Sequence, residues 1–237
     1  MLQIPPQLML NTVNPLNAQA WLESKGAGLA QTKLLAEGKW YKAGEWIDEV
    51  ARRFRIKPEW ILTVLQKEQS LAREKSVMPA AFTLVRVKDI PADYVPPTDK
   101  NGVTVRYVRS KDGPYRVTGS WRLIAATGAG IPDPKVTPPW DVAVYLGLGN
   151  QIYQTAKLTS KWLDQFERAV VEGKPADRTV TLYPTAAEIA LANKEGRKPR
   201  GENVVAADGP TFVALQYTPS EDAAILAMNS FKSLGFV

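Results

Sequence analysis

The chain has 237 residues, 45% of them hydrophobic, which is enough to bury a sizeable core in one large domain. It contains no cysteine and no histidine, which excludes disulfides, thiol nucleophiles, catalysis by Ser-His-Asp or Cys-His groups, and zinc sites built on those ligands. The net charge of +6 and the pI near 9.4 favour a polyanionic partner such as nucleic acid, anionic lipid or bacterial wall.

We expect neither a signal peptide nor a membrane-spanning helix in this sequence. No run of the sequence approaches the roughly 18 apolar residues of a membrane-spanning helix, so we expect no membrane insertion. The opening stretch, M-L-Q-I-P-P-Q-L-M-L, lacks the basic and apolar regions of a signal peptide. Residues 1–16 are rich in Pro and Asn without a clear period, and they predict an extended lead-in to a domain that fills 17–237.

Two helices are predicted next. Asn17 is the expected N-cap of a helix that ends near Ser24, before a segment containing two glycines. Apolar residues at helical spacing predict a second, amphipathic helix at about 42–55. With the helix that follows, it would form a packed helix–turn–helix. Lys67 and Arg73 are too few basic residues to make that third helix a DNA-recognition helix.

The stretch 56–72 predicts this third helix. Pro58 suits its first turn, where the missing N–H has no helical partner. Four residues recur on one apolar face: Trp60, Ile61, Val64 and Leu65. Glu68 falls on the same face, and burial of a carboxylate raises its pKa toward neutrality, which suits a general acid. The alternative is a Glu at the rim of the apolar stripe, reaching water or a cationic partner.

Residues 83–120 change in character. Apolar and charged residues alternate, and the turn dipeptides Asn101-Gly102 and Asp112-Gly113 lie between them, which predicts a small β-rich insertion. Such a charged hairpin is either a solvated surface or a grip on an anionic polymer. Residues 121–139, dense in Gly and Pro, predict a loop.

Helix is predicted from about 140 to 171, although Gly147 and Gly149 are unfavourable inside it by roughly 1 kcal/mol each. The remaining chain predicts two short strands that pair with each other, and three helices. The strands are expected at 179–183 and 203–206, and the helices at 185–193, 212–216 and 221–234.

Five short motifs occur in order along the chain, at 21–26, 65–70, 126–133, 147–153 and 214–219. They resemble, in turn, the opening helix, the catalytic Glu helix, the Gly-rich loop, the glycine-to-glutamine substrate motif and the late Tyr motif of the lysozyme superfamily. The resemblance is closest to soluble lytic transglycosylases and goose-type lysozymes. It spans about 17–236. The stretches near 79–118 and 186–202 are longer than that family's pattern.

The resemblance implies a lysozyme-like domain of the α+β class, mainly α, with a β-rich insertion at about 79–118. It implies cleavage of the β-1,4 bond between N-acetylmuramic acid and N-acetylglucosamine in peptidoglycan, by a monomer without metal or organic cofactor. Glu68 is the implied acid/base, and Gln151 and Tyr217 would hold the sugar. The other implied substrate-binding residues are Gly147, Gly149, Gly128 and Asp133. The implied location is the cell wall, the extracellular space or a virion, as for a phage lysin.

Several alternatives stay open. Hydrolysis needs a second carboxylate, for which the candidates are Asp133, Asp141, Asp89, Asp93 and Asp99. Without one, a lytic transglycosylase would form a 1,6-anhydromuramyl end. A catalytically inactive wall-binding or virion structural module is the second function considered, and a nucleic-acid-binding protein, which fits the charge but no motif, is the third. Trp60, Trp121 and Trp140 are either core residues or platforms for sugar rings.

Overall fold

The computed structural model describes residues 4, 8, 9, 15–37, 39–73, 75, 127, 148–220 and 222–237. These residues form mainly α-helix with two small antiparallel sheets of two strands each, which confirms the predicted α+β, mainly α class. No helix in this part of the chain is long and apolar enough to cross a membrane. The predicted insertion at 79–118 lies outside the described residues.

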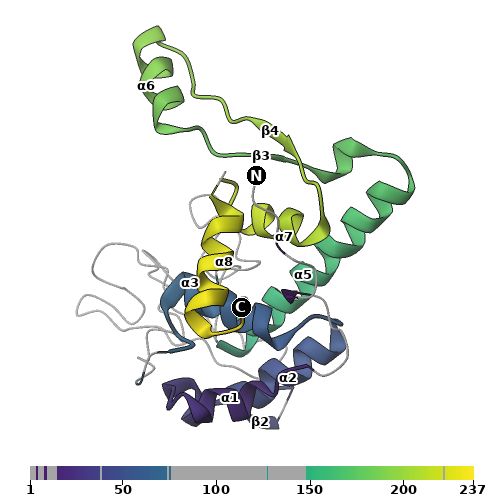
Figure 1. Ribbon diagram of the computed structural model, residues 1–237, viewed down its shortest axis with the longest axis vertical. Helices are drawn as coiled ribbons and strands as arrows, with labels where there is room; N and C mark the ends of the chain where they lie inside the picture. The colour runs from purple at the N-terminus through teal and green to yellow at the C-terminus, as the bar shows by residue number, and fades with distance from the viewer. Residues whose placement is uncertain are drawn as a thin grey trace, which may run out of the picture. The chain divides into compact units, whose positions relative to one another are not determined.

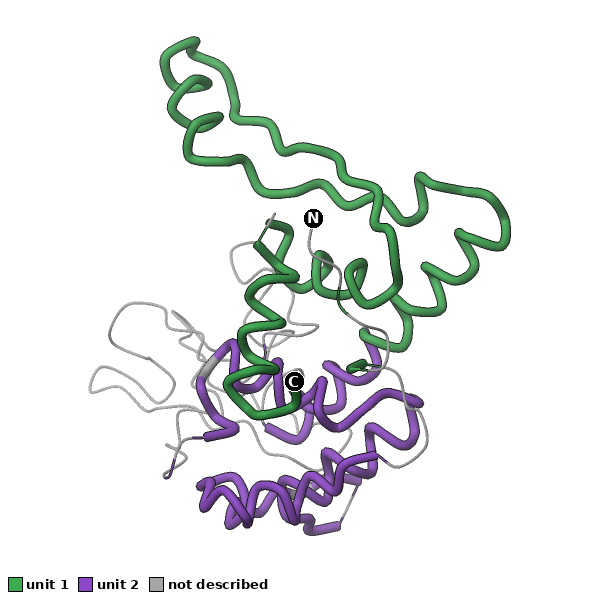
Figure 2. The backbone as a smooth tube through the Cα atoms, viewed as in Figure 1, with its two compact units in different colours: residues 1–10, 159–237 green, residues 11–158 purple. Residues whose placement is uncertain are grey.

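The contacts within the chain group it into two compact units, drawn in Figure 2. Unit 1 comprises residues 1–10 and 159–237, and unit 2 comprises residues 11–158. The boundary falls inside the long helix α5, Leu148–Val171. The prediction of one domain over 17–237 stays a prediction.

Unit 2 begins with helix α1, Ala18–Ser24, and its start is fixed by local hydrogen bonds. The Asn17 side chain accepts from the Ala20 N–H at 2.7 Å, which confirms the predicted N-cap. The Asp48 carboxylate accepts from the Ala18 N–H at 2.8 Å, and its burial raises the pKa of Asp48. Gly26, with φ of 61°, turns the chain where the sequence predicts the helix to end.

A short 3-10 helix, Gly28–Gln31, leads into a hairpin that has no counterpart among the predicted elements. Strand β1, Lys33–Ala36, pairs antiparallel with β2, Lys39–Lys42. Helix α2, Ala43–Arg53, follows at once and is two residues shorter at its C-terminal end than the predicted helix. The Lys42 N–H donates to the Glu45 carboxylate at 2.8 Å, so a local contact marks the start of α2.

Helix α3, Pro58–Gln69, has Pro58 in its first turn, as predicted. Trp60 to Leu65 are all buried, which places the middle of α3 in the core of unit 2. The helix ends at Ser70, whose φ of 56° is left-handed. Trp46 of α2 is fully buried, and its indole N–H donates to the Gly149 carbonyl at 2.9 Å, which attaches the first turn of α5 to the same core.

Unit 1 contains the rest of α5, a 3-10 turn at Pro175–Arg178, and the strands β3, Thr179–Thr181, and β4, Asn203–Val205. The two strands pair antiparallel, as predicted. Helix α7, Gly209–Tyr217, and helix α8, Ala223–Leu234, bury Phe212 and Phe231 completely. The predicted helix at 212–216 therefore starts earlier, because Asp208 caps it by accepting from the Thr211 N–H at 2.7 Å.

Between β3 and β4 the chain forms an arm, defined here as residues 182–202. Figure 1 shows helix α6, Ala186–Glu195, at the far end of this arm, away from α7 and α8. Gly201 lets the two legs of the arm approach closely, since a Cβ there would lie 1.9 Å from the Leu182 carbonyl oxygen. The arm is therefore closed at its base by backbone contact.

Candidate functional site

Glu68 lies in the last turn of α3, and of the two interpretations of its position the structure agrees with the exposed one. Its side chain is 34% exposed and forms an ion pair with Lys67, with 2.9 Å between Lys67 Nζ and Glu68 Oε1. The structure therefore agrees with the alternative of a Glu at the rim of the apolar stripe. The physical reason is that α3 leaves the core after Leu65 and ends at Ser70. There the chain turns, and the Leu71 N–H donates to the Leu65 carbonyl at 3.2 Å.

Trp60 is buried, with 2% of its surface exposed. It is therefore a core residue of α3, and a sugar ring has no access to its face. Trp121 and Trp140, the other two candidates for stacking on sugars, lie outside the described residues.

Gln151 connects two of the five motifs. It is fully buried on α5, and its side-chain oxygen accepts from the Thr127 N–H at 3.2 Å and from the Thr127 hydroxyl at 3.1 Å. The Gln151 backbone carbonyl also accepts from the Thr155 hydroxyl at 2.8 Å. Thr127 belongs to the Gly-rich motif at 126–133, so that motif and the glycine-to-glutamine motif meet within unit 2. In this arrangement the Gln151 side chain fixes the position of Thr127 through these hydrogen bonds.

Gly149 is also buried in the first turn of α5, where its carbonyl accepts from the Trp46 indole. The backbone of Gly149 is therefore part of the core of unit 2. The other predicted residues of the Gly-rich loop and the glycine-to-glutamine motif, Gly128, Asp133 and Gly147, lie outside the described residues. So do the remaining candidates for a second carboxylate, Asp141, Asp89, Asp93 and Asp99.

Tyr217 is the last residue of α7 and is partly exposed. Its ring meets the Trp162 ring edge to face, with the ring centroids 5.0 Å apart at 89°. Tyr217 belongs to unit 1, whereas Glu68 and Gln151 belong to unit 2. A cleft shared by all three residues stays a prediction.

Two features of the described residues, one in each unit, were not predicted. One is the β1–β2 hairpin, on which Trp40 is 70% exposed; the turn residues Glu37-Gly38 between two short apolar runs were an available signal. The other is a cluster around Glu188 on the arm. Its carboxylate accepts from the Arg197 guanidinium at 2.5 and 3.2 Å and from the Arg200 N–H at 3.0 Å.

The Glu188 cluster has a clear electrostatic consequence. The hydrogen bonds from Arg197, followed by the one from the Arg200 backbone, lower the pKa of Glu188 to about 2. A pocket of about 720 Å³ opens beside this cluster, between the base of the arm and the turn from α7 to α8, with Tyr183 and Asp222 on its wall. Across the described residues, no three acidic side chains lie close enough together to hold a metal ion.

Comparison with protein-family models, with curated proteins and with solved structures finds no match to this chain. The resemblance to lysozyme-like wall enzymes therefore rests on the five short motifs of the sequence.

Proposed function

We propose that the protein cleaves the β-1,4 bond between N-acetylmuramic acid and N-acetylglucosamine in peptidoglycan, with Glu68 as the acid/base. The observation that carries this proposal is the contact of Thr127 with Gln151. It brings the Gly-rich motif and the glycine-to-glutamine motif together, since Thr127 and Gln151, 24 residues apart, meet through two hydrogen bonds to one side-chain oxygen. The contact therefore supports the resemblance beyond the sequence itself.

The position of Glu68 supports the same role. A general acid must come within hydrogen-bond reach of the atom that it protonates. The Glu68 carboxyl is accessible, and it sits on a helix whose middle is anchored in the core. In the proposed reaction Glu68 gives its proton to the glycosidic oxygen as the bond to the anomeric carbon breaks.

Two products are then possible, depending on which oxygen attacks the anomeric carbon. In hydrolysis, water attacks the anomeric carbon and gives its proton to a carboxylate. In the lytic transglycosylase reaction, the 6-hydroxyl oxygen of the same sugar attacks the anomeric carbon, and its proton goes to the Glu68 carboxylate. The resemblance favours the second reaction. Its product carries a 1,6-anhydromuramyl end and is lighter than the hydrolysis product by one water.

One observation favours a second candidate function, a wall-binding or virion structural module without catalysis. Glu68 is partly exposed and ion-paired with Lys67, whereas the general acid of such enzymes lies in an apolar pocket. This candidate would bind the wall and leave it intact.

Lysis of purified cell walls tests the proposal. Replacing Glu68 by Gln keeps the shape of the side chain but removes the proton donor, so Glu68→Gln is expected to lower the rate of lysis by at least about 100-fold. Glu172→Gln is the matched control, because Glu172 is also exposed and ion-paired with a Lys, at 2.7 Å from Lys174. Mass spectrometry of the released muropeptides identifies the anhydro end.

The outcomes separate the candidates. Lysis by the wild type and by Glu172→Gln, but not by Glu68→Gln, supports the enzyme. A wild-type protein that binds walls without lysing them supports the structural module. Lysis by Glu68→Gln at the wild-type rate would remove Glu68 from the mechanism.

A further inference from the structure

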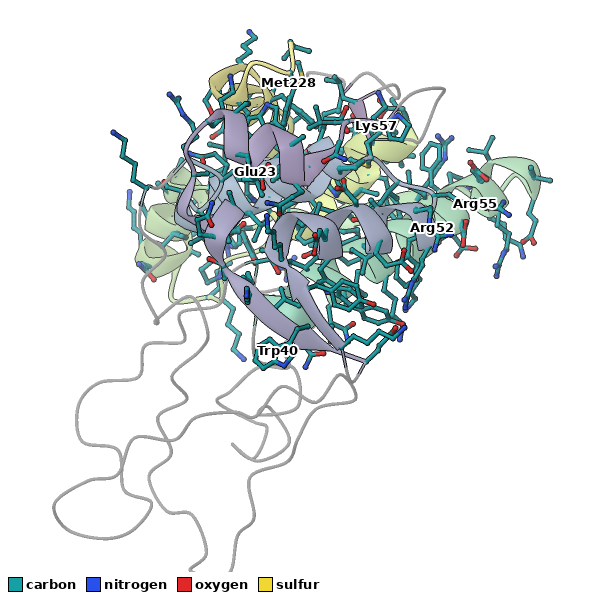
Figure 3. The ribbon with its side chains drawn as sticks, turned by 90° about the horizontal axis from the view of Figure 1, so that it is seen from below. Glu23, Trp40, Arg52, Arg55, Lys57 and Met228 are labelled. Atoms are coloured by element: carbon teal, nitrogen blue, oxygen red, sulfur yellow. The ribbon has the colours of Figure 1, made fainter. Side chains whose placement is uncertain are left out.

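Trp40 on strand β2 is a large aromatic residue in an unusual environment. Tryptophan is highly buried on average, yet the Trp40 side chain is 70% exposed. Figure 3 shows it projecting from the β1–β2 hairpin. Because so little of the ring is buried, the fold gains little from it. A residue of this kind at a protein surface is typical of binding sites, where Trp is enriched.

The register of the hairpin places two lysines on the same face as Trp40. Lys33 is paired with Lys42, and Leu35 is paired with Trp40. Since side chains alternate between the two faces of a strand, Lys33, Trp40 and Lys42 share one face. We call these three residues the Trp40 face.

The opposite face of the hairpin is used by the core of unit 2. Leu34 is 4% exposed and Ala36 is fully buried. The Tyr41 ring packs against the Trp46 ring, with 5.1 Å between the centroids. The hairpin is therefore held in place by one face, and the Trp40 face is left open to solvent.

The Trp40 face borders a shallow pocket of about 470 Å³, lined by Lys33, Trp40, Tyr41, Lys42 and Glu45. The carboxylate in this pocket has a partner, since Glu45 accepts from the Lys42 N–H at 2.8 Å. Lys42 is ion-paired with Glu23 at 3.0 Å. Lys33 forms no ion pair with any of the described residues. Within the described part of the chain, the pocket therefore offers a flat apolar ring beside a lysine that has no ion-pair partner.

We propose that the Trp40 face binds an anionic polysaccharide. The apolar C–H face of a sugar ring stacks on the exposed indole, which removes apolar surface from water on both sides. Carboxylates of the polymer pair with Lys33 and, in exchange with Glu23, with Lys42. The choice of a peptidoglycan strand as the polysaccharide rests on the proposed function. The Trp40 face would hold this strand in addition to the residues around Glu68.

Sedimentation with purified peptidoglycan tests the proposal, in the Glu68→Gln background so that the wall stays intact during the assay. Trp40→Ala is expected to raise the dissociation constant about fivefold to tenfold, in line with the loss of one well-placed aromatic contact. Trp40→Phe should retain part of the affinity. Tyr183→Ala is the matched control, because Tyr183 is an aromatic residue of the arm that is 66% exposed.

The lysine is tested in the same assay. Lys33→Gln is expected to weaken binding about twofold at low salt, and the difference should disappear at high salt, because exposed charges are screened. Lys194→Gln, which removes an exposed lysine of the arm, is its control and should bind as the parent does.

Unchanged peptidoglycan binding by Trp40→Ala overturns the proposal. So does tighter, Trp40-dependent binding of a single-stranded DNA oligonucleotide, because bases and phosphates would then fit the Trp40 face better than a glycan. The result is independent of catalysis. If the wild type does not lyse walls and Trp40→Ala loses wall binding, the role of the Trp40 face is supported and the enzyme is rejected. If the wild type lyses walls and Trp40→Ala binds them normally, the enzyme is supported and the role of the Trp40 face is rejected.

Discussion

Helices α3 and α6 are similar in length, with 12 and ten residues, but different interactions hold them. In α3, every residue from Trp60 to Leu65 is buried. In α6, all ten residues of which are described, only Ala192 is buried. Local signals start both helices, Pro58 in one and the Thr185 cap in the other. The comparison shows that the same secondary structure rests on apolar burial in α3 and on hydrogen bonds and ion pairs in the arm.

The largest effect expected from this difference is the loss in the free energy of unfolding when a leucine is truncated. Leu62→Ala removes a fully buried side chain from α3 and should lower the free energy of unfolding by about 2–5 kcal/mol. Leu191→Ala is its counterpart on α6, where the side chain is 46% exposed, and should cost about 0.5 kcal/mol or less. Denaturant unfolding of both variants measures the difference. Equal losses would mean that α6 has an apolar partner, which would contradict the difference described between α3 and α6.

A smaller effect is expected at the base of the arm. In Gly201→Ala the new Cβ would meet the Leu182 carbonyl oxygen, which is backbone and cannot move aside alone. The arm should open more easily by about 1–3 kcal/mol, a typical cost of overpacking. Hydrogen exchange of the Leu182 amide, which donates to the Glu202 carbonyl at 2.7 Å, reports this opening.

The control for this variant is Gly173→Ala, where a new Cβ has nothing within 4 Å. It carries the strain of a left-handed alanine without a clash, and the Leu182 amide should exchange as in the wild type. Fast exchange of the α3 amides in Gly201→Ala would show that the arm and the core open together, which contradicts the comparison.

The smallest effect expected is the pH response of the arm. Because Arg197 and the Arg200 N–H hold the pKa of Glu188 at about 2, below its ordinary value of 4.5, the cluster contributes its full stability above pH 4.5. That contribution is lost as the pH falls from 4.5 toward 2. The Arg200 amide resonance should titrate with a midpoint near 2 by NMR, and Glu188→Gln should abolish this titration. A midpoint near 4.5 would mean that the cluster does not form in solution.

The sequence by itself determined the presence of the helices and of the β3–β4 pair, and several of the helix starts. Asn17, Pro58 and Thr185 mark three helix starts, and the pairing of β3 with β4 follows from two short apolar runs around the arm. These signals are readable because a cap or a turn involves residues only a few positions apart. For the same reason, the mainly helical class with small sheets could be predicted.

Only the tertiary structure decided which surfaces face water and which distant segments meet. Periodicity placed Glu68 on the apolar face of α3, but the helix leaves the core one turn earlier, so the carboxylate is exposed and pairs with Lys67. Gln151 meets Thr127 across 24 residues of chain, and Trp40 is left in solvent although its neighbour Tyr41 packs inward. Burial depends on how separate elements pack together, and the spacing of residues within one element does not contain that information.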